Sequence, residues 1–126
     1  MSYQIEWGKN GVVVEFEGAT SIESIDEAGQ DVYKDPRLSH CSFILFNFDL
    51  ADLSEITLEQ IRGTADADHN RSLEFPNPVL IIVSNQPIAD ALVFHYKLSA
   101  ESSGVKWEIK LFGSSKEAFQ WCRNIA

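Results

Sequence analysis

The sequence predicts an α/β fold with a mostly parallel, mixed sheet that begins with an N-terminal β-hairpin. Two short segments with alternating apolar residues open the chain, and a Gly-Lys-Asn-Gly turn lies between them. Three more apolar segments follow, each separated from the next by a stretch with helical periodicity. Strands that alternate with helices favour a parallel sheet with right-handed crossovers. The expected order of elements is therefore β-β-α-β-α-β-α-β-α.

Length and charge limit the classes of protein that fit. A chain of 126 residues can bury one hydrophobic core but is short for two domains, so we expect one domain over residues 1–126. No apolar run approaches the roughly 20 residues of a membrane-spanning helix, and the first residues lack the features of a secretory signal. We therefore expect a cytoplasmic protein without stable membrane insertion. A formal charge of −9 disfavours binding to nucleic acid.

The first three elements are predicted from local patterns. Residues 3–7 and 11–18 alternate apolar and polar side chains, and the Asn-Gly pair between them suits a tight hairpin turn. A helix follows within residues 19–37, where Thr20 and Glu23 have the spacing of a capping box. Asp35-Pro36 is expected to end this helix, because the residue before a proline avoids the helical region.

The remaining strands differ in character. Residues 42–48 and 79–83 are short and almost wholly apolar, which is typical of strands covered by helices on both faces. Residues 105–112 alternate instead, with Trp107, Ile109 and Leu111 on one side and Lys106, Glu108 and Lys110 on the other. A strand with one charged face is expected at an edge of the sheet. Helices are predicted over residues 54–73, 87–104 and 114–126.

The second helix of the chain, predicted over residues 54–73, has a weak apolar face. Its apolar stripe passes through Ala65 and then continues with Asp68 and Ser72. Either the helix ends near Ala67, or its far half rests loosely on the sheet. Residues 65–71 bring two aspartates and a histidine together, but carboxylates two positions apart point to different sides of a helix and no second histidine accompanies them. We expect a solvated helix end and no metal.

The third helix has more apolar residues than one buried face requires. Phe94 falls close to its solvent face and has apolar neighbours, which indicates a contact surface for a partner or for a second copy of the chain. A homodimer through the Phe94 region is therefore one expectation. His95 lies toward the buried side and is interpreted as a hydrogen-bonded packing residue. The expected core face consists of Ile88, Ala89, Leu92, Tyr96 and Ser99.

Polar side chains follow the ends of the predicted parallel strands, and these ends meet at one edge of a sheet. The edge collects residues 19–21, 49–57, 84–86 and 113–115. Ser, Thr, Asn and Asp at such positions cap helices, each with a contribution of about 1 kcal/mol. Capping is the expected role of Thr20, Ser84 and Ser114.

The loop after the third strand carries more acceptor side chains than one helix start can use. Asp52 with Glu55 and Thr57 with Gln60 both have capping-box spacing, and only one pair can cap the helix. Asp49 belongs to neither pair. It either bonds backbone N–H groups of the loop or contributes to a polar site for a ligand or partner. The candidate binding residues of the chain are Asp49, Asp52, Ser54, Thr57, Ser84, Asn85 and Phe94.

Four segments resemble the STAS domain, and more closely the bacterial SpoIIAA-like (STAS/SEC14-like) proteins. They are the opening hairpin, "FILFNFDLADLS", "VLIIVS" and "VKWEIKLFGSSKEAFQWC", and the resemblance covers nearly the whole chain. It implies a SpoIIAA-like fold and a regulatory module that binds a protein partner. In anti-sigma factor antagonists of this type, a serine at the start of the helix after the third strand is phosphorylated, which abolishes docking to a partner kinase. The matching position is Thr57, with Ser54 nearby, although the sequence reads "SEITLEQ" around Thr57 in place of Asp-Ser-Ser-Gly.

These residues favour three functions to different degrees. The first is a non-enzymatic regulatory or binding module, which docks a protein partner through the sheet edge around the loop after the third strand. The alternative is a carrier of an apolar small molecule or lipid, held between the second and third helices and the sheet. An enzyme fits least, because Cys41 and Cys122 do not lie at strand-to-helix turns and none of the three histidines maps to the polar edge. We expect no catalytic residue, no cofactor and no metal.

Overall fold

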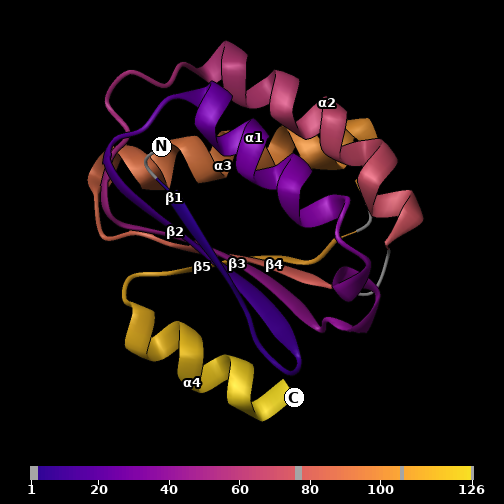
Figure 1. The fold of residues 1–126 in the computed structure, drawn as a ribbon. Coiled ribbons are helices and arrows are strands. Elements are labelled where there is room, and N and C mark those ends of the chain that lie inside the picture. Colours follow the sequence, from indigo (N-terminus) through magenta and orange to yellow (C-terminus); the bar gives the residue numbers. More distant parts are fainter. Residues whose placement is uncertain (1–2, 76–77, 106, 126) are drawn as a thin grey trace.

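The computed structural model describes residues 3–75, 78–105 and 107–125. In this part of the chain a five-stranded sheet carries four α-helices and one short 3-10 helix (Figure 1). The strands lie in chain order across the sheet; β1 is antiparallel to β2, and all other pairs are parallel. This arrangement confirms the predicted fold class and element order. The elements are β1 (Tyr3–Trp7), β2 (Gly11–Ala19), α1 (Ile22–Tyr33), η1 (Pro36–His40), β3 (Phe43–Asp52), α2 (Leu58–Glu74), β4 (Val79–Val83), α3 (Pro87–Ser103), β5 (Ile109–Phe112) and α4 (Ser115–Ile125).

The helices cover the two faces of the sheet unequally. Helices α1, α2 and α3 lie together on one face, and α4 alone lies on the other (Figure 1). The buried residues accordingly form two cores. The larger core lies under the three helices and the smaller one lies under α4, where Leu45, Ile81 and Val83 contact Ala118 and Cys122.

The hairpin forms for the reasons that the sequence suggests. Alternate residues of β2 are buried, and β1 pairs with β2 from Tyr3 opposite Phe16 to Trp7 opposite Val12. Gly11 starts β2 where the ring of Phe43 on the neighbouring strand lies against its backbone. A Cβ atom at Gly11 would lie 2.3 Å from that ring, so this close approach requires glycine.

Strand β3 is longer than predicted and contains an irregularity. Its register pairs Asn47 with Glu15 and Leu50 with Glu17, so β3 advances three residues while β2 advances two. One extra residue reverses the alternation of side chains. The core side chains are therefore even-numbered as far as Phe48 and odd-numbered from Ala51 onward. The strand includes Asp52, which had been expected in the following loop.

The end of α1 agrees with the prediction. The helix ends at Tyr33, and the Asp35 carboxylate then accepts a hydrogen bond from the backbone N–H of Arg37 at 2.9 Å. This contact caps the short helix η1, which the sequence had not indicated. Within η1, Leu38 is fully buried and fixes the segment against the larger core.

Helix α2 differs from both predicted alternatives. It continues to Glu74, and the polar residues Asp68 and Ser72 are buried along with Ala65. The expected solvated helix end is therefore wrong. The carboxylate of Asp68 is accommodated because Tyr96 and Arg71 donate hydrogen bonds to it.

The buried face of α3 is rotated relative to the predicted face. Val93 and Ala100 are buried, whereas Ile88 is exposed and Ser99 is half-buried. Ile88 lies in the first turn, at the edge where the strands end, so the sheet does not cover it. Phe94 remains exposed, as expected.

Strand β5 lies at the edge of the sheet, as predicted, but is shorter than the expected span. Trp107 precedes it and is buried in the larger core, where Ile109 and Leu111 also pack. The expected positions of Lys106 and Ala126 lie outside the described residues. No described helix has the combined length and hydrophobicity needed to span a membrane.

Candidate functional site

Hydrogen bonds join the four connections at the carboxyl edge of the sheet, here called the polar rim (residues 19–21, 49–57, 84–86 and 113–115). The backbone N–H of Thr20 donates to the carbonyl of Asp52 at 3.0 Å. The backbone N–H of Ser84 donates to the carbonyl of Phe112 at 3.1 Å. Residues distant in sequence are thus neighbours at this edge.

Asp49 lies between β3 and the start of α4. Its Oδ2 accepts a hydrogen bond from the Ser115 hydroxyl at 2.9 Å, and the Asn47 side-chain amide donates to the same hydroxyl oxygen at 3.0 Å. The side-chain Oδ1 of Asn47 accepts from the backbone N–H of Asp49 at 3.0 Å. The expected bonds from Asp49 to loop N–H groups are therefore wrong. Its Oδ1 is buried and makes no hydrogen bond to any described residue.

Thr57 caps α2. Its hydroxyl oxygen accepts from the backbone N–H of Gln60 at 3.2 Å, and the Gln60 side chain accepts from the backbone N–H of Thr57 at 3.0 Å. This is a complete capping box, which decides between the two predicted pairs. Asp52 instead accepts from the backbone N–H of Ser54 at 3.0 Å, and this contact lowers the pKa of the Asp52 carboxyl. Ser54 and Thr57 are both exposed.

Two of the three expected caps are wrong. Ser21, rather than Thr20, caps α1 by accepting from the backbone N–H of Ser24 at 3.2 Å. Thr20 is buried, and its hydroxyl donates to the carbonyl of Gly18. Ser84 is also buried and accepts from the backbone N–H of Gln86 ahead of α3, which has no side-chain cap.

At the fourth connection, Ser114 accepts from the backbone N–H of Glu117 at 3.3 Å at the start of α4, which agrees with the expected cap. Gln86 has a role that the sequence reasoning missed. Its side-chain amide donates to the carbonyls of Phe48 and Ala51 at 3.2 and 2.6 Å, so it holds the end of β3 against the start of α3. Asn85 is exposed beside it. The one sequence feature that could have indicated this contact is the position of the glutamine, directly before Pro87.

The polar rim combines exposed apolar and acidic side chains. Leu50 is 69% exposed at the end of β3, and Leu58 is 45% exposed in the first turn of α2. Asp52 and Glu55 lie between them in sequence and are exposed. The ion pairs of the described residues all lie elsewhere: Lys34–Asp31, Arg37–Asp35, Arg71–Asp68 and Lys110–Glu108. Phe94 lies two turns into α3 and is not part of this edge.

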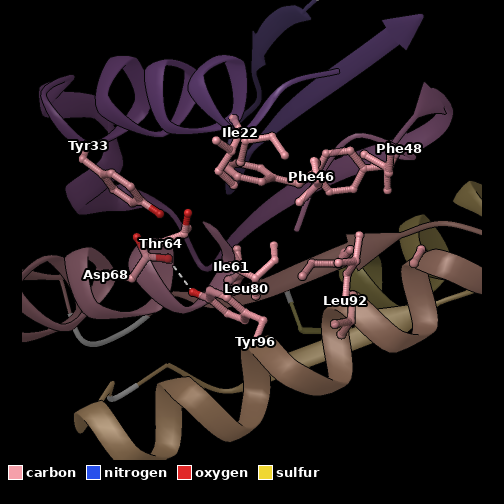
Figure 2. Close-up of a pocket in the computed structure, with 16 residues that line it drawn as sticks. Ile22, Tyr33, Phe46, Phe48, Ile61, Thr64, Asp68, Leu80, Leu92 and Tyr96 are labelled. Atoms are coloured by element: carbon pink, nitrogen blue, oxygen red, sulfur yellow. Dashed lines mark hydrogen bonds between the residues drawn. The ribbon is translucent and has the colours of Figure 1, made fainter. Parts of the chain in front are cut away.

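A pocket of about 70 Å³ lies between the sheet and the three helices on its larger-core side (Figure 2). Most of its lining is apolar. The lining side chains come from α1, α2 and α3 and from the middle strands, and they include Ile22, Phe46, Ile61, Leu80 and Leu92.

Polar groups gather at one end of this pocket. Figure 2 shows the hydroxyls of Tyr33, Thr64 and Tyr96 close to the Asp68 carboxylate. The Tyr96 hydroxyl donates to Asp68 Oδ2, and Arg71 Nη1 donates to Asp68 Oδ1 at 3.2 Å. Burial raises the pKa of the Asp68 carboxyl to about 6, although both hydrogen bonds act in the opposite direction.

The ring of Tyr33 has two close contacts. The Arg71 guanidinium lies 4.6 Å from the ring centre, and the Trp107 ring stacks on Tyr33 at 5.5 Å. The indole N–H of Trp107 donates to the carbonyl of Phe75 at 2.6 Å. The polar stripe of Asp68 and Ser72 on α2 is the sequence pattern that could have indicated the buried polar contacts of Asp68.

The described residues offer little catalytic chemistry. Burial raises the pKa of both thiols, that of Cys122 to about 11, so both are protonated at neutral pH. Both thiols are free. Over residues 3–75, 78–105 and 107–125, no group of three or more His, Cys, Asp or Glu side chains could hold a metal ion.

Comparison with known proteins shows the fold. The sequence matches no protein-family model and no curated protein. The structure is similar to that of the anti-sigma factor antagonist SpoIIAA in its unphosphorylated form, with a TM-score of 0.59, 17% identity, and coverage of 97% of this chain and 98% of that one. It is also similar to the Bacillus cell fate determinant SpoIIAA in the phosphorylated form, with a TM-score of 0.53, 13% identity, and coverage of 95% and 98%. The chain therefore has a STAS/SpoIIAA-like fold, as the resemblance predicted.

Proposed function

We propose that this chain is a regulatory module without catalytic activity, which docks a protein partner through the polar rim. The similar solved structure is described as an anti-sigma factor antagonist, a protein that acts on another protein. The observation that carries the proposal is the surface of the rim itself. Leu50 is an exposed apolar side chain among exposed carboxylates, and such a combination favours a contact surface over a solvated loop.

The test compares two exposed leucines. Tagged chain with Leu50→Ala and tagged chain with Leu73→Ala are used to capture partners from the native cell, beside the unaltered chain. Leu73 is 54% exposed and lies at the far end of α2, so it serves as the matched control. We expect a specific partner whose affinity falls at least tenfold with Leu50→Ala, as for an interface hot spot, and does not change with Leu73→Ala. Equal effects of the two variants would contradict docking at the rim.

We further propose that phosphorylation of Thr57 controls this docking, with Ser54 as the alternative position. Both hydroxyl-bearing residues are exposed, and Thr57 begins α2. A phosphate on Thr57 would add about two negative charges between Glu55 and Glu59 and would repel an acidic surface of a partner.

The test uses chain purified from the native cell and fragmented for mass analysis, which locates any phosphate. Binding of the captured partner is then measured for Thr57→Glu, Thr57→Ala and Ser54→Glu. We expect Thr57→Glu to weaken binding more than Ser54→Glu, and Thr57→Ala to retain it. Retention of full affinity by Thr57→Glu and absence of phosphate in the native chain would remove Thr57 from the proposal.

A second candidate function is the carriage of a small molecule in the pocket under α1, α2 and α3. The observation that favours it is the mostly apolar cavity of about 70 Å³. An engineered cavity of about 150 Å³ holds benzene, so this one is too small for a lipid acyl chain. The test is native mass spectrometry of freshly purified chain. We expect a bound mass that is lost on unfolding, and an unliganded mass throughout would argue against carriage.

A further inference from the structure

We propose that the pocket binds a small, uncharged amphiphile, whose polar group bonds the hydroxyl of Tyr33 and whose apolar body lies against β3 and β4. This inference rests on the second candidate function and names the chemical class of the molecule carried.

Tyr33 supplies the free hydrogen-bonding group. Thr64 donates to an Asp26 oxygen at 3.1 Å, and the Tyr96 hydroxyl donates to Asp68. The hydroxyl of Tyr33 forms no hydrogen bond to a described residue, and it points toward Thr64 and Asp68 at the end of the pocket (Figure 2). Tyr33 is partly buried and its hydroxyl borders the pocket, so a ligand oxygen placed here would gain a hydrogen-bond donor.

The charges around Tyr33 select against ionised ligands. An anionic group at Tyr33 would lie near the carboxylates of Asp68 and Asp26; burial first, and these carboxylates after it, raise the pKa of the Tyr33 hydroxyl. A cationic group would meet Arg71, which already pairs with Asp68 and lies over the Tyr33 ring. An anion therefore meets two like charges, and an ion of either sign loses its hydration in this mostly apolar site. An alcohol, amide or ketone avoids both the repulsion between like charges and the loss of an ion's hydration.

The volume limits the apolar body. The pocket has about half the volume of a cavity that holds benzene, so it accepts only a short apolar chain. The side chains that would contact this chain are apolar and belong to rigid elements: Phe46 on β3, Leu80 on β4, Ile61 on α2 and Leu92 on α3.

The experiment uses three probes with the same four-carbon skeleton and different head groups: butyramide, butyrate and butylammonium. Each is titrated into the full chain with isotope-labelled methyl groups, and the methyl resonances of Ile61, Leu80 and Leu92 are followed by NMR. We expect saturable shifts with butyramide, and at least tenfold weaker binding of the two ions. Equal or tighter binding of either ion would overturn the proposed class.

Two tyrosine variants test the contact itself. Tyr33→Phe keeps the ring that stacks on Trp107 but removes the hydroxyl, so we expect butyramide to bind about 3- to 10-fold more weakly. Tyr3→Phe is the control, because its hydroxyl bonds Asp31 at 2.8 Å outside the pocket. Unchanged binding to Tyr33→Phe, in a variant whose spectrum shows the native fold, would overturn the role of Tyr33.

The outcomes separate this inference from the function on which it rests. If butyramide fails to bind while native mass spectrometry shows a bound mass, the chemical class is wrong and carriage stands. If butyramide fails to bind and the native mass is unliganded, the inference and carriage both fail. Docking of a protein partner at the rim is tested by Leu50→Ala and is independent of either result.

Discussion

Asp68 illustrates how a charged side chain can occupy the buried face of a helix. Its two oxygens are bonded by Tyr96 of α3 and by Arg71 one turn further along α2. Burial nevertheless raises the pKa of this carboxyl from 3.8 to about 6, because removal of the charge from water outweighs the gain from both donors. The folded chain therefore holds a proton at Asp68 more tightly than the unfolded chain does.

This difference predicts how stability depends on pH. Between pH 4 and pH 6 the folded state carries the Asp68 proton and the unfolded state does not, so the contribution of Asp68 to stability falls as the pH rises through this window. A pKa difference of this size corresponds to roughly 3 kcal/mol. We expect the free energy of unfolding of Asp68→Asn, measured with denaturant from pH 4 to pH 7, to lack this component relative to the unaltered chain. If the free energy of unfolding changed with pH in the same way for both chains, the raised pKa of Asp68 in the folded state would be contradicted.

The capping residues show what single-residue reasoning can resolve. The pair Thr57–Gln60 was one of two allowed choices, and the sequence could not separate it from Asp52–Glu55. Asp52 belongs to β3, and α2 begins only at Leu58, so the cap is the residue directly before it, Thr57. In the same way, the backbone of Thr20 is engaged by β3, so capping of α1 falls to Ser21. Strand pairing over long sequence distances determined both results.

At the scale of the element, α2 depends on its first turn. Thr57→Ala removes the hydroxyl that accepts from the backbone N–H of Gln60. We expect a loss of about 1 kcal/mol in the free energy of unfolding. Ser54→Ala, three residues earlier and exposed, serves as the control with a change of about 0.5 kcal/mol or less. Equal effects of the two changes in thermal or denaturant unfolding would mean that the cap contributes nothing.

Replacement of two glycines by alanine, one inside a helix and one at a helix end, is expected to change the stability of the chain in opposite directions. Gly63 lies inside α2, and a Cβ there would meet nothing within 4 Å, so Gly63→Ala should raise stability by roughly 1 kcal/mol. Gly104 ends α3 with φ of +82°, and a Cβ there would also lie 3.2 Å from the His69 ring. Gly104→Ala should therefore lower stability by about 1 kcal/mol or more. Denaturant unfolding measures both, and a shift of the same sign in both variants would contradict the assignment.

The elements themselves were largely predictable, and their ends were less so. The apolar run of β4 matched its observed bounds, and the alternation of residues 105–112 correctly placed β5 at an edge. The length of β3 was missed because its last residues carry polar side chains typical of loops. They remain in the strand because Leu50, Ala51 and Asp52 pair with the end of β2, a contact that the local pattern does not contain.

For the molecule as a whole, the alternation of strands and helices was sufficient to predict the sheet, and with it the edge where the polar connections meet. The pocket was harder to predict from the sequence. The weak apolar face of α2 suggested loose packing, but the gathering of Tyr33, Thr64 and Asp68 depends on how α1 and α2 lie beside each other. Such an arrangement follows from packing and cannot be obtained from the periodicity of either helix.

The outer face of α3 leads to a prediction about association. Phe94 is 60% exposed and Leu98 is 47% exposed, one turn apart on the same helix. We expect the chain to self-associate weakly through this face, which sedimentation measurements over a range of concentrations would detect. Phe94→Ser should shift the chain to monomer, whereas Leu73→Ser on α2 should not. Sedimentation as a monomer at every concentration would remove this surface from consideration.

The order of the strands has a consequence for how the chain is made. Each of the five described strands pairs with its neighbours in sequence, so none of these strands must wait for a distant partner. During synthesis the sheet can grow by one strand at a time from the hairpin, and each new crossover helix covers the strand pair just completed. The face under α4 stays open until α4 emerges, so a nascent chain without α4 exposes Leu45, Ile81 and Val83 to chaperones and to aggregation.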